Sequence, residues 1–400
     1  MRTMSERLAV DGGRPTRAER LPLHKPWFDH REASAVNSVL AGTHVAGDGA
    51  CGKELERLLR DSTGVRGVLA VNSCTAALEM AMDIAGIGPG DQVILPSFTF
   101  VSTANAVLKA GARPVFADIN PRTFGLDPAD VSRRVTPQTR AIVPVHYAGM
   151  ACDLDALEAV ATRHRLLIIE DAAHSVNAAY RGRALGGWGG LGALSFHETK
   201  DVACGEGGAL LVRDDETWLH AAEILREKGT DRSAFLRGER DKYTWVGLGS
   251  SYVLSELLAA IAVEQFKKIS EITRRKTIQA ERLLSALAPY RDVVQTPVVP
   301  EGCRPNWHVF AVLVDPAVRD WALRALRAEG VSAAFHYVPL HSAPYAKASA
   351  DMATVDLPVT DRVAASLIRL PISAAFTDRD CDDIVTASVK VFERMATLAL

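Results

Sequence analysis

The sequence has 400 residues, of which 48% are hydrophobic and 24% are charged, as is typical of soluble globular proteins. This composition excludes disordered, collagen-like and low-complexity chains, and the length allows two or three domains. With 46 Lys and Arg against 48 Asp and Glu, the formal net charge is −2. The overall charge therefore favours neither a nucleic acid nor an anionic membrane as partner, and we expect neither.

Cysteine spacing and the lack of long apolar stretches predict a cytoplasmic protein. The six cysteines are scattered without a C-x-x-C pair, which is typical of reduced thiols and of neither a disulfide framework nor a zinc site. The first residues, MRTMSERLAVDGGRP, lack the apolar region of a secretory signal. The longest stretch poor in charge, residues 243–263, is too polar to span a bilayer.

Three regions follow one another along the chain. We expect residues 1–66 to form an arm and a helix that pack on a large domain. From residue 67 to 295, short apolar runs (GVLAVN, DQVILP, RPVFAD, RAIVPVHY, RLLIIEDAA) alternate with segments of helical periodicity. Runs that are apolar throughout are typical of parallel strands buried on both faces, so the alternation predicts a large α/β domain with a mostly parallel sheet.

The second half of this region and the C-terminus follow a different pattern. Two more apolar runs, GALSF and GGALLV, lie close together, and a long helical region is expected from Leu254 to about Leu287. Pro and Gly cluster at residues 297–305, which predicts a boundary before a small α+β domain at residues 296–400. That domain would contain the runs NWHVFAVLV and VSAAFHY, a helix near Ala317–Glu329 and a final helix after Thr377.

One stretch matches the dinucleotide-binding fingerprint in its residues but not in its predicted structural context. Residues 187–192, GWGGLG, match G-x-G-x-x-G, but that motif should follow a strand and open a helix. Here it follows a polar turn and runs into the strand ALSFH. We therefore do not expect NAD to bind there.

An anion site is expected where a strand meets a helix at Ser73, Cys74 and Thr75. Free N–H groups and the positive end of a helix dipole favour a phosphate at such a place. Ser73 or Thr75 could equally serve only as the cap of the helix.

Two further features lie at strand ends in the same region. Glu170 and Asp171 end a buried strand, close to His174, where open α/β sheets place their ligands. Lys200 lies between a buried strand and the glycine-dense GEGG turn, from which a desolvated amine could attack a carbonyl. Read singly, each residue could be a cap or a solvated charge, but their order in the chain favours one site.

The stretch FHYVPLH carries His336 and His341. Pro339 argues against a helix there, and no Cys or carboxylate completes a metal set, so we expect no metal. A substrate-facing loop and a packing role both remain open for these histidines.

Taken together, these motifs resemble the DegT/StrS family of sugar aminotransferases, fold-type I enzymes that depend on pyridoxal 5′-phosphate (PLP). The likeness extends from residue 47 to residue 371 and is greatest to the WecE-type transaminases, which make dTDP-4-amino-4,6-dideoxygalactose. It is carried by VNSCTAALEMA, LPSFTFVSTANAV, IVPVHYAGMACDLD, FHETK, EILREKGTDRSAFLRGERDKYTWVGLGSSYVLSEL and FHYVPLH.

The resemblance implies a role for each motif. Lys200 would carry the cofactor covalently and shuttle the proton, and Asp171 would pair with the pyridine nitrogen. Phe100 would stack on the ring, and His174 would lie near the ring hydroxyl. The cofactor phosphate would be held by Ser73, Cys74, Thr75 and Ser195. Ser251 stands where family members usually supply an Asn from a second subunit.

The implied reaction is amination of C4 of a dTDP-4-keto-6-deoxyhexose, with L-glutamate as donor, in a homodimer with shared active sites. On the sugar side we expect His336 and Tyr337, with a group of arginines for the diphosphate, namely Arg232, Arg237 and Arg240. Alternatives are amination at C3, a non-catalytic PLP-binding homologue and an NAD-dependent oxidoreductase. A sugar dehydratase of the same fold would have histidine in place of Lys200.

Overall fold

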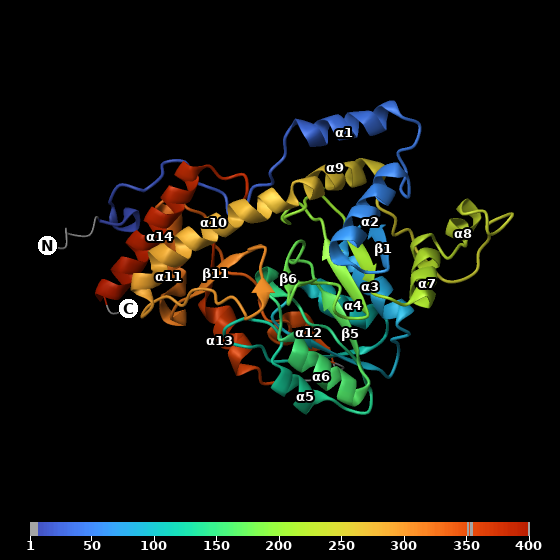
Figure 1. Cartoon of the computed structure of the whole chain (residues 1–400). Coiled ribbons are helices and arrows are strands. Elements are labelled where there is room, and N and C mark those ends of the chain that lie inside the picture. The colour runs from blue at the N-terminus through green and yellow to red at the C-terminus, as the bar shows by residue number, and fades with distance from the viewer. Residues whose placement is uncertain (1–6, 350–351, 353–354, 399–400) are drawn as a thin grey trace.

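A mostly parallel sheet forms the centre of the molecule (Figure 1). The computed structural model describes residues 7–349, 352 and 355–398. Within them, seven strands have the order β1-β9-β8-β5-β4-β2-β3. Their bounds are β1 (Gly67–Val71), β2 (Gln92–Pro96), β3 (Arg113–Ala117), β4 (Thr139–Ile142), β5 (Leu167–Asp171), β8 (Leu191–Ser195) and β9 (Gly208–Val212). All run parallel except β9, which is antiparallel to both of its neighbours, so the predicted fold class is confirmed.

Helices cover both faces of this sheet. The helices of this part of the chain are α1 (His30–Ala41), α2 (Ala50–Thr63), α3 (Cys74–Ile84), α4 (Val101–Lys109), α5 (Pro128–Arg134), α6 (Leu154–His164), α7 (Glu216–Arg226), α8 (Arg232–Leu236) and α9 (Glu256–Lys267). Of these, α1 packs on α9 and α8 lies beside α7, so neither of them covers the sheet directly. On β1, Leu69 and Val71 pack in a cluster with α3, α4 and α7. Val68 and Ala70 pack on the opposite face with α2 and α9. Burial on both faces explains why the strand is apolar throughout.

The C-terminal part has its own core and a two-stranded sheet. Its elements are α10 (Ile269–Leu287), β11 (Phe310–Leu313), α11 (Pro316–Ala328), α12 (Pro344–Ala348), α13 (Pro358–Ser366), β12 (Leu367–Leu370) and α14 (Asp378–Leu398). β11 pairs with β12 in antiparallel fashion. A small separate sheet is formed by β6 (Ala179–Tyr180), β7 (Arg183–Ala184) and β10 (Cys303–Arg304).

VSAAFHY was expected to be one of the elements of this domain, but it forms no strand. Val331 bridges to Leu21, whereas Ala334 bridges to Arg369 of β12. Because these two residues pair with different parts of the chain, no continuous ladder forms. The partner of β11 is instead β12, which the sequence analysis did not identify.

Helix α10 joins the two main cores. Ile269 and Ile272 pack with α2 and α9 against the large sheet, whereas Leu283 and Leu287 pack with α11 and α14. The N-terminal arm was expected to pack on the large domain. Leu8 and Leu21 of this arm are instead part of the C-terminal core. The domain boundaries at residues 66 and 295 stay a prediction, and residues 1–6, 350–351, 353–354, 399 and 400 lie outside the described residues.

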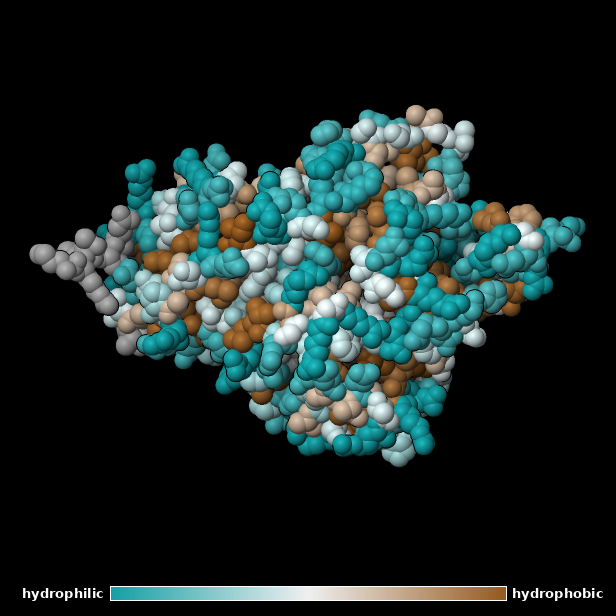
Figure 2. Space-filling model, viewed as in Figure 1, coloured by the Kyte–Doolittle hydropathy of each residue, from teal (hydrophilic) through white to brown (hydrophobic). Residues whose placement is uncertain are grey.

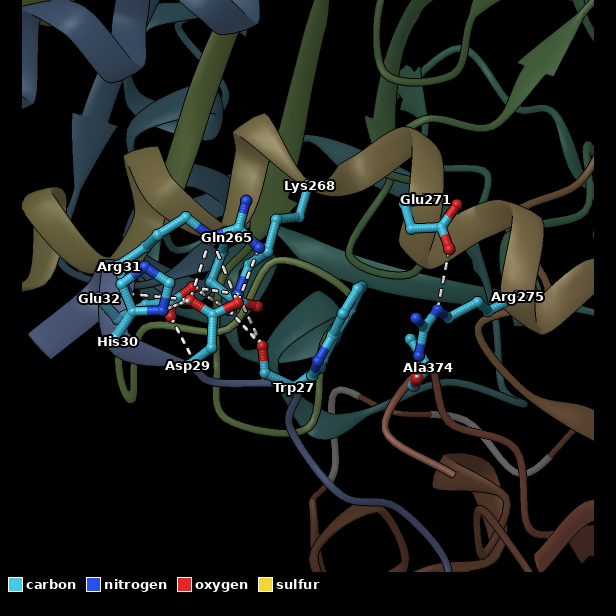
Figure 3. Close-up of polar contacts among 10 residues, drawn as sticks. All are labelled: Trp27, Asp29, His30, Arg31, Glu32, Gln265, Lys268, Glu271, Arg275 and Ala374. Carbon is cyan, nitrogen blue, oxygen red and sulfur yellow. Dashed lines mark hydrogen bonds and ion pairs between the residues drawn. The ribbon is translucent and has the colours of Figure 1, made fainter. Parts of the chain in front are cut away.

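The long helical region expected from Leu254 to Leu287 is divided at Lys268 into α9 and α10 (Figure 3). The Lys268 side chain is buried, donates to the carbonyl oxygen of Trp27 at 2.9 Å and forms an ion pair with Glu32 of α1. The guanidinium of Arg275 lies 4.2 Å from the centre of the Trp27 ring. The segment before α1 is thus anchored at the joint between the two helices.

Across the described ranges, no helix has the length and apolar character needed to cross a membrane.

Candidate active site

A cavity of about 660 Å³ lies at the carboxyl edge of the parallel strands. Ligand sites of open α/β sheets are found at this edge, because the loops that follow neighbouring strands meet there. Most of the residues predicted from the sequence line it, namely Ser73, Cys74, Thr75, Phe100, Asp171, His174, Ser195, Lys200, His336 and Tyr337.

One end of the cavity is the beginning of α3. The hydroxyl oxygen of Ser73 accepts the N–H of Ala76 at 3.0 Å, so Ser73 does cap the helix. The amides of Cys74 and Thr75 precede this bond, in the first turn, where N–H groups have no partner within a helix. Burial, and then the charge of Asp171, raise the pKa of the Cys74 thiol well above its ordinary value, so the thiol stays neutral. The two interpretations of this motif are therefore compatible, since the cap leaves the first amides to an anion.

Asp171 ends β5 and is fixed from two sides. Its Oδ2 accepts a hydrogen bond from the Thr103 hydroxyl of α4 at 2.7 Å, and its Oδ1 accepts the N–H of Ala173 at 3.2 Å. The residue is only 5% exposed. A carboxylate held this rigidly at a cavity wall can pair with a cationic ring nitrogen without moving.

The neighbouring carboxylate, Glu170, has a structural role. It accepts the N–H groups of Gly186, Trp188 and Gly189 at 2.6–2.8 Å and contacts His146 Nε2 at 2.8 Å. The glycine-rich turn that imitates a dinucleotide fingerprint therefore wraps around a carboxylate of the protein itself. Because side chains alternate along a strand, Glu170 points away from the cavity that Asp171 faces.

Lys200 follows the turn after β8 and lines the cavity. Burial lowers the pKa of its amine to about 8, although the charges of Asp171 and Asp201 oppose this shift. The N–H of Lys200 donates to the carbonyl oxygen of His197 at 2.8 Å, which fixes the turn. A buried amine with this pKa loses its proton near neutral pH and can act as a nucleophile and as a base.

Aromatic and imidazole rings from both parts of the chain lie at another wall of the cavity. The Tyr147 hydroxyl lies 2.7 Å from Nδ1 of His336, and the Tyr337 hydroxyl lies 3.3 Å from Nε2 of His174. Nδ1 of His174 accepts the N–H of Ala148 at 3.3 Å, so Nε2 carries the hydrogen. Burial lowers the pKa of both histidines, and both are neutral. Phe100, by contrast, is 58% exposed on the cavity wall.

Four predicted residues lie away from this cavity. Ser251 is exposed and accepts the side-chain amide of Asn72 through its carbonyl oxygen at 3.1 Å. The other three belong to a lobe around α8 that projects from the body of the molecule (Figure 1) and pair there with carboxylates. Arg232 contacts Asp48 and Glu227, Arg237 contacts Glu223 and Glu239, and Arg240 lies 4.0 Å from Asp231.

Sequence reasoning missed Arg369 of β12, whose side chain lines the cavity. Its buried Nε has no hydrogen-bond partner among the described residues. Its positive charge contributes to the lowered pKa of His336 and of Lys200. A lone arginine in the apolar run LIRLPI was the signal that could have found it, because a cation in a buried strand needs an anion. Thr103 and His308 were also missed.

His341, the second histidine of FHYVPLH, has a packing role. Its Nδ1 lies 2.8 Å from the Ser97 hydroxyl, and its Nε2 lies 3.4 Å from Asp361. Throughout the part of the chain that the structure describes, no group of three or more His, Cys, Asp or Glu side chains could hold a metal ion.

Comparisons with known proteins agree with this geometry. Residues 26–389 match the model of the DegT/DnrJ/EryC1/StrS aminotransferase family. The spore coat polysaccharide biosynthesis protein SpsC of Bacillus subtilis (strain 168) is 34% identical over 375 residues, which cover 92% of this chain and 96% of SpsC.

Two solved structures are similar at the level of the whole chain. The aminotransferase TlmJ from Streptoalloteichus hindustanus is 31% identical with a TM-score of 0.85, covering 95% of this chain and 100% of its own. DesV of S. venezuelae, solved in complex with a ketimine intermediate, is also 31% identical with a TM-score of 0.85. The match covers 94% of this chain and 100% of the DesV chain. The chain therefore belongs to the DegT/DnrJ/EryC1/StrS aminotransferase family, whose members are PLP-dependent sugar aminotransferases.

Proposed function

We propose that the enzyme aminates C4 of a dTDP-4-keto-6-deoxyhexose with L-glutamate as donor, giving a dTDP-4-amino-4,6-dideoxyhexose as the WecE-type transaminases do. The observation that carries its cofactor chemistry is the meeting of three groups in one cavity: the start of α3, the carboxylate of Asp171 and the amine of Lys200. The C4 position and the dTDP sugar rest on the resemblance of the motifs to WecE-type transaminases. The three groups match the phosphate, the ring nitrogen and the carbonyl of PLP in kind and in number. The residues present therefore fit the cofactor of the family.

PLP, when bound, supplies an electron sink for the carbon that loses a proton. Asp171 would hold the ring nitrogen protonated, since Thr103 and the amide of Ala173 keep its carboxylate in place. The first amides of α3 and the hydroxyls of Ser73, Thr75 and Ser195 would hold the phosphate. His174 would donate its Nε2 hydrogen near the ring hydroxyl, and the exposed face of Phe100 would cover the ring.

Lys200 would carry out the proton transfers. With its pKa near 8, the amine is partly neutral at physiological pH, so it can attack the cofactor carbonyl and later move a proton between carbons. Neutral His174 and His336 do not compete for that proton, because burial holds their pKa values low. The same base would serve both half-reactions, first with the donor and then with the keto sugar.

Arg369 supports an acidic amino donor such as L-glutamate. Its guanidinium faces the cavity, and its Nε has no partner within the described residues. Guanidinium groups bind carboxylates through two parallel hydrogen bonds. We therefore assign Arg369 to a donor carboxylate.

A homodimer would account for the predicted site residues that do not line the cavity of their own chain. Hydrophobic surface is visible on the projecting lobe around α8 (Figure 2). Within the lobe, the side chain of Trp245 is 77% exposed and that of Leu248 is 87% exposed. We infer that this lobe packs on a second subunit, which would bring Arg232, Arg237, Arg240 and Ser251 toward the partner's cavity.

Incubation with dTDP-4-keto-6-deoxyglucose and L-glutamate tests the proposal. NMR of the product should show an amine at C4 and would give its configuration, galacto or gluco. A parallel reaction with the 3-keto isomer tests amination at C3, and L-aspartate in place of glutamate tests the donor. If the protein accepts an amino group from the donor but aminates neither sugar, the proposed sugar substrate is wrong. If the cofactor is bound but accepts no amino group from either donor, the result favours the non-catalytic alternative.

A further inference from the structure

A buried ion pair involves the residue that follows the predicted cofactor lysine in the chain. Asp201, the residue after Lys200, is 7% exposed and pairs through Oδ1 with Nζ of Lys276, which is 1% exposed. The mechanism described above uses neither residue. Nζ of Lys276 also lies 3.3 Å from the carbonyl oxygen of His308.

The second oxygen of Asp201 is held from the C-terminal side. Nδ2 of Asn306 donates to Oδ2 of Asp201 at 3.0 Å, and it also lies 2.8 Å from the carbonyl oxygen of His174. Nδ1 of His308 lies 3.3 Å from the same carboxylate oxygen. The Asp201 carboxylate therefore ties three segments together: the lysine turn, α10 and the segment before β11.

Its place in the fold makes this pair a link between the two halves of the molecule. Lys276 lies in α10 between Ile272, which packs against the large sheet, and Leu283, which packs in the C-terminal core. Asn306 and His308 precede β11 of the two-stranded sheet in the C-terminal part. The cofactor turn is thus connected through one carboxylate to both cores that surround the cavity.

Stability alone is a weak reason for such a pair. Taking two charges out of water is costly, and replacing a buried pair by apolar side chains of similar size is often neutral or stabilising. Removing only one partner is destabilising, because it leaves the other charge buried and uncompensated. A role in the site accounts better for a pair placed one residue from Lys200.

We propose that Asp201, held by Lys276 and Asn306, is a positioning residue for Lys200: it fixes the turn that carries the amine and favours the protonated form of that amine. The inference rests on the role proposed for Lys200. Asp171 and Asp201 are the charged groups that favour the charge of the amine, and the Cys74 thiol beside them is kept neutral by burial. Arg369 opposes the charge of the amine, and the buried neutral rings of His174, His308 and His336 face it as well.

The test measures the protonation of Lys200 without cofactor or turnover. Cofactor-free protein is treated with an amine-reactive reagent over a range of pH, and peptide mass spectrometry reads the labelling of Lys200. Wild-type protein should reach half-maximal reactivity near pH 8. The variant for comparison is the double substitution Asp201→Asn with Lys276→Met, which removes both charges together and so leaves neither one uncompensated.

We expect this midpoint to fall by about half a pH unit in the double variant. The Asp201 carboxylate is among the groups that act most on the amine of Lys200, whereas the Lys276 ammonium, whose loss opposes the shift, is not. The melting temperature of the double variant should stay close to that of the wild type. The single variant Asp201→Asn should melt at a lower temperature, since the charge of Lys276 is then unpaired.

The control is a second buried lysine–carboxylate pair, far from the cavity. Glu32→Gln with Lys268→Met removes the pair shown in Figure 3, which does not line the cavity. Its Lys200 midpoint should equal that of the wild type. An unchanged midpoint in the Asp201 and Lys276 variant, or an equal shift in the control, would overturn the proposal.

A separate experiment tests the role proposed for Lys200 itself, independently of Asp201. Borohydride reduction of wild-type holoenzyme should attach the cofactor to the peptide that contains Lys200. If the cofactor is found elsewhere, the role of Lys200 is wrong, whatever the labelling midpoints show.

Discussion

Gly208 of β9 lies so close to the start of α3 that a Cβ atom on it would be 2.5 Å from the amide nitrogen of Cys74. It would also be 2.5 Å from the carbonyl carbon of Ser73 and 2.7 Å from the carbonyl oxygen of Leu194. All three neighbours are backbone atoms, which cannot rotate away. Gly208, the last glycine of GEGG, therefore sets how closely the sheet approaches the proposed phosphate site.

Gly208→Ala should consequently weaken PLP binding, because the first amides of α3 must shift. We expect a rise in the dissociation constant of about tenfold or more, the equivalent of one lost hydrogen bond to a charged group. Gly88→Ala is the matched control, since its Cβ would meet only a carbonyl oxygen at 3.8 Å. Titration of cofactor-free protein with PLP measures both variants. Equal affinities in the two would show that the start of α3 does not hold the phosphate.

Lys200→Ala should lose transamination by several orders of magnitude while the protein stays folded. The amine is the nucleophile and the base in the proposed mechanism, and an alanine methyl group can replace neither function. The measurement is turnover with both substrates, together with circular dichroism for the fold. Substantial turnover without any added amine would contradict the assignment.

Asp171→Asn should bind PLP more weakly and be almost inactive, because an amide cannot keep the ring nitrogen protonated. Thr103→Val removes only the 2.7 Å hydrogen bond to Oδ2 and leaves the charge in place. We therefore expect a smaller loss for it, of about 1.5–3 kcal/mol in transition-state stabilisation. Single-turnover kinetics of each half-reaction compare the two variants. Were Asp171→Asn to match the wild type, the carboxylate would be structural, as Glu170 is.

Arg369→Met should raise KM for L-glutamate by roughly 30-fold, since losing a buried charge-assisted contact costs about 2 kcal/mol or more. The methionine side chain keeps most of the volume of the arginine stem in β12. The second half-reaction, from the aminated cofactor to the keto sugar, should change much less. Following the cofactor spectrum separates the two. Equal loss in both half-reactions would place Arg369 at the cofactor or at the sugar instead.

Most strands of the large sheet could be predicted from the sequence, because strands buried on both faces are apolar throughout. LLIIED was expected to be a strand that ends in carboxylates, and β5 does end at Asp171. β12 escaped notice because the run LIRLPI is short and is interrupted by Arg369. VSAAFHY was a comparable run, but its residues bridge to two distant segments, so only tertiary structure could distinguish the two runs.

The site was predictable where the neighbours in sequence are neighbours in space. Ser73, Cys74 and Thr75 begin one helix, and their order in the chain is already a phosphate-binding pattern. The choice between Glu170 and Asp171 was not predictable from the residues alone, since it depends on which face of the sheet each side chain takes. Arg369 comes to the cavity from β12, which the sequence analysis did not identify, and only the fold brings it beside the groups of the large sheet.

The lobe around α8 gives the last prediction, which concerns the arginines. Arg232, Arg237 and Arg240 pair with carboxylates of their own chain and do not line its cavity. If they bind the nucleotide diphosphate, they must do so in a partner subunit. Association of the two chains and binding of the sugar would then depend on the same lobe.

Trp245→Asp combined with Leu248→Asp should therefore give a monomer, because charges would replace two strongly exposed apolar side chains of the interface. Val299→Asp, at a more modestly exposed valine outside the lobe, is the control and should stay dimeric. Analytical ultracentrifugation measures the mass of each variant. Neutralising the three arginines should instead keep the dimer and raise KM for the nucleotide sugar, with the glutamate half-reaction unchanged. A dimeric Trp245 and Leu248 variant, or arginine variants that impair both half-reactions equally, would place the interface and the nucleotide site elsewhere.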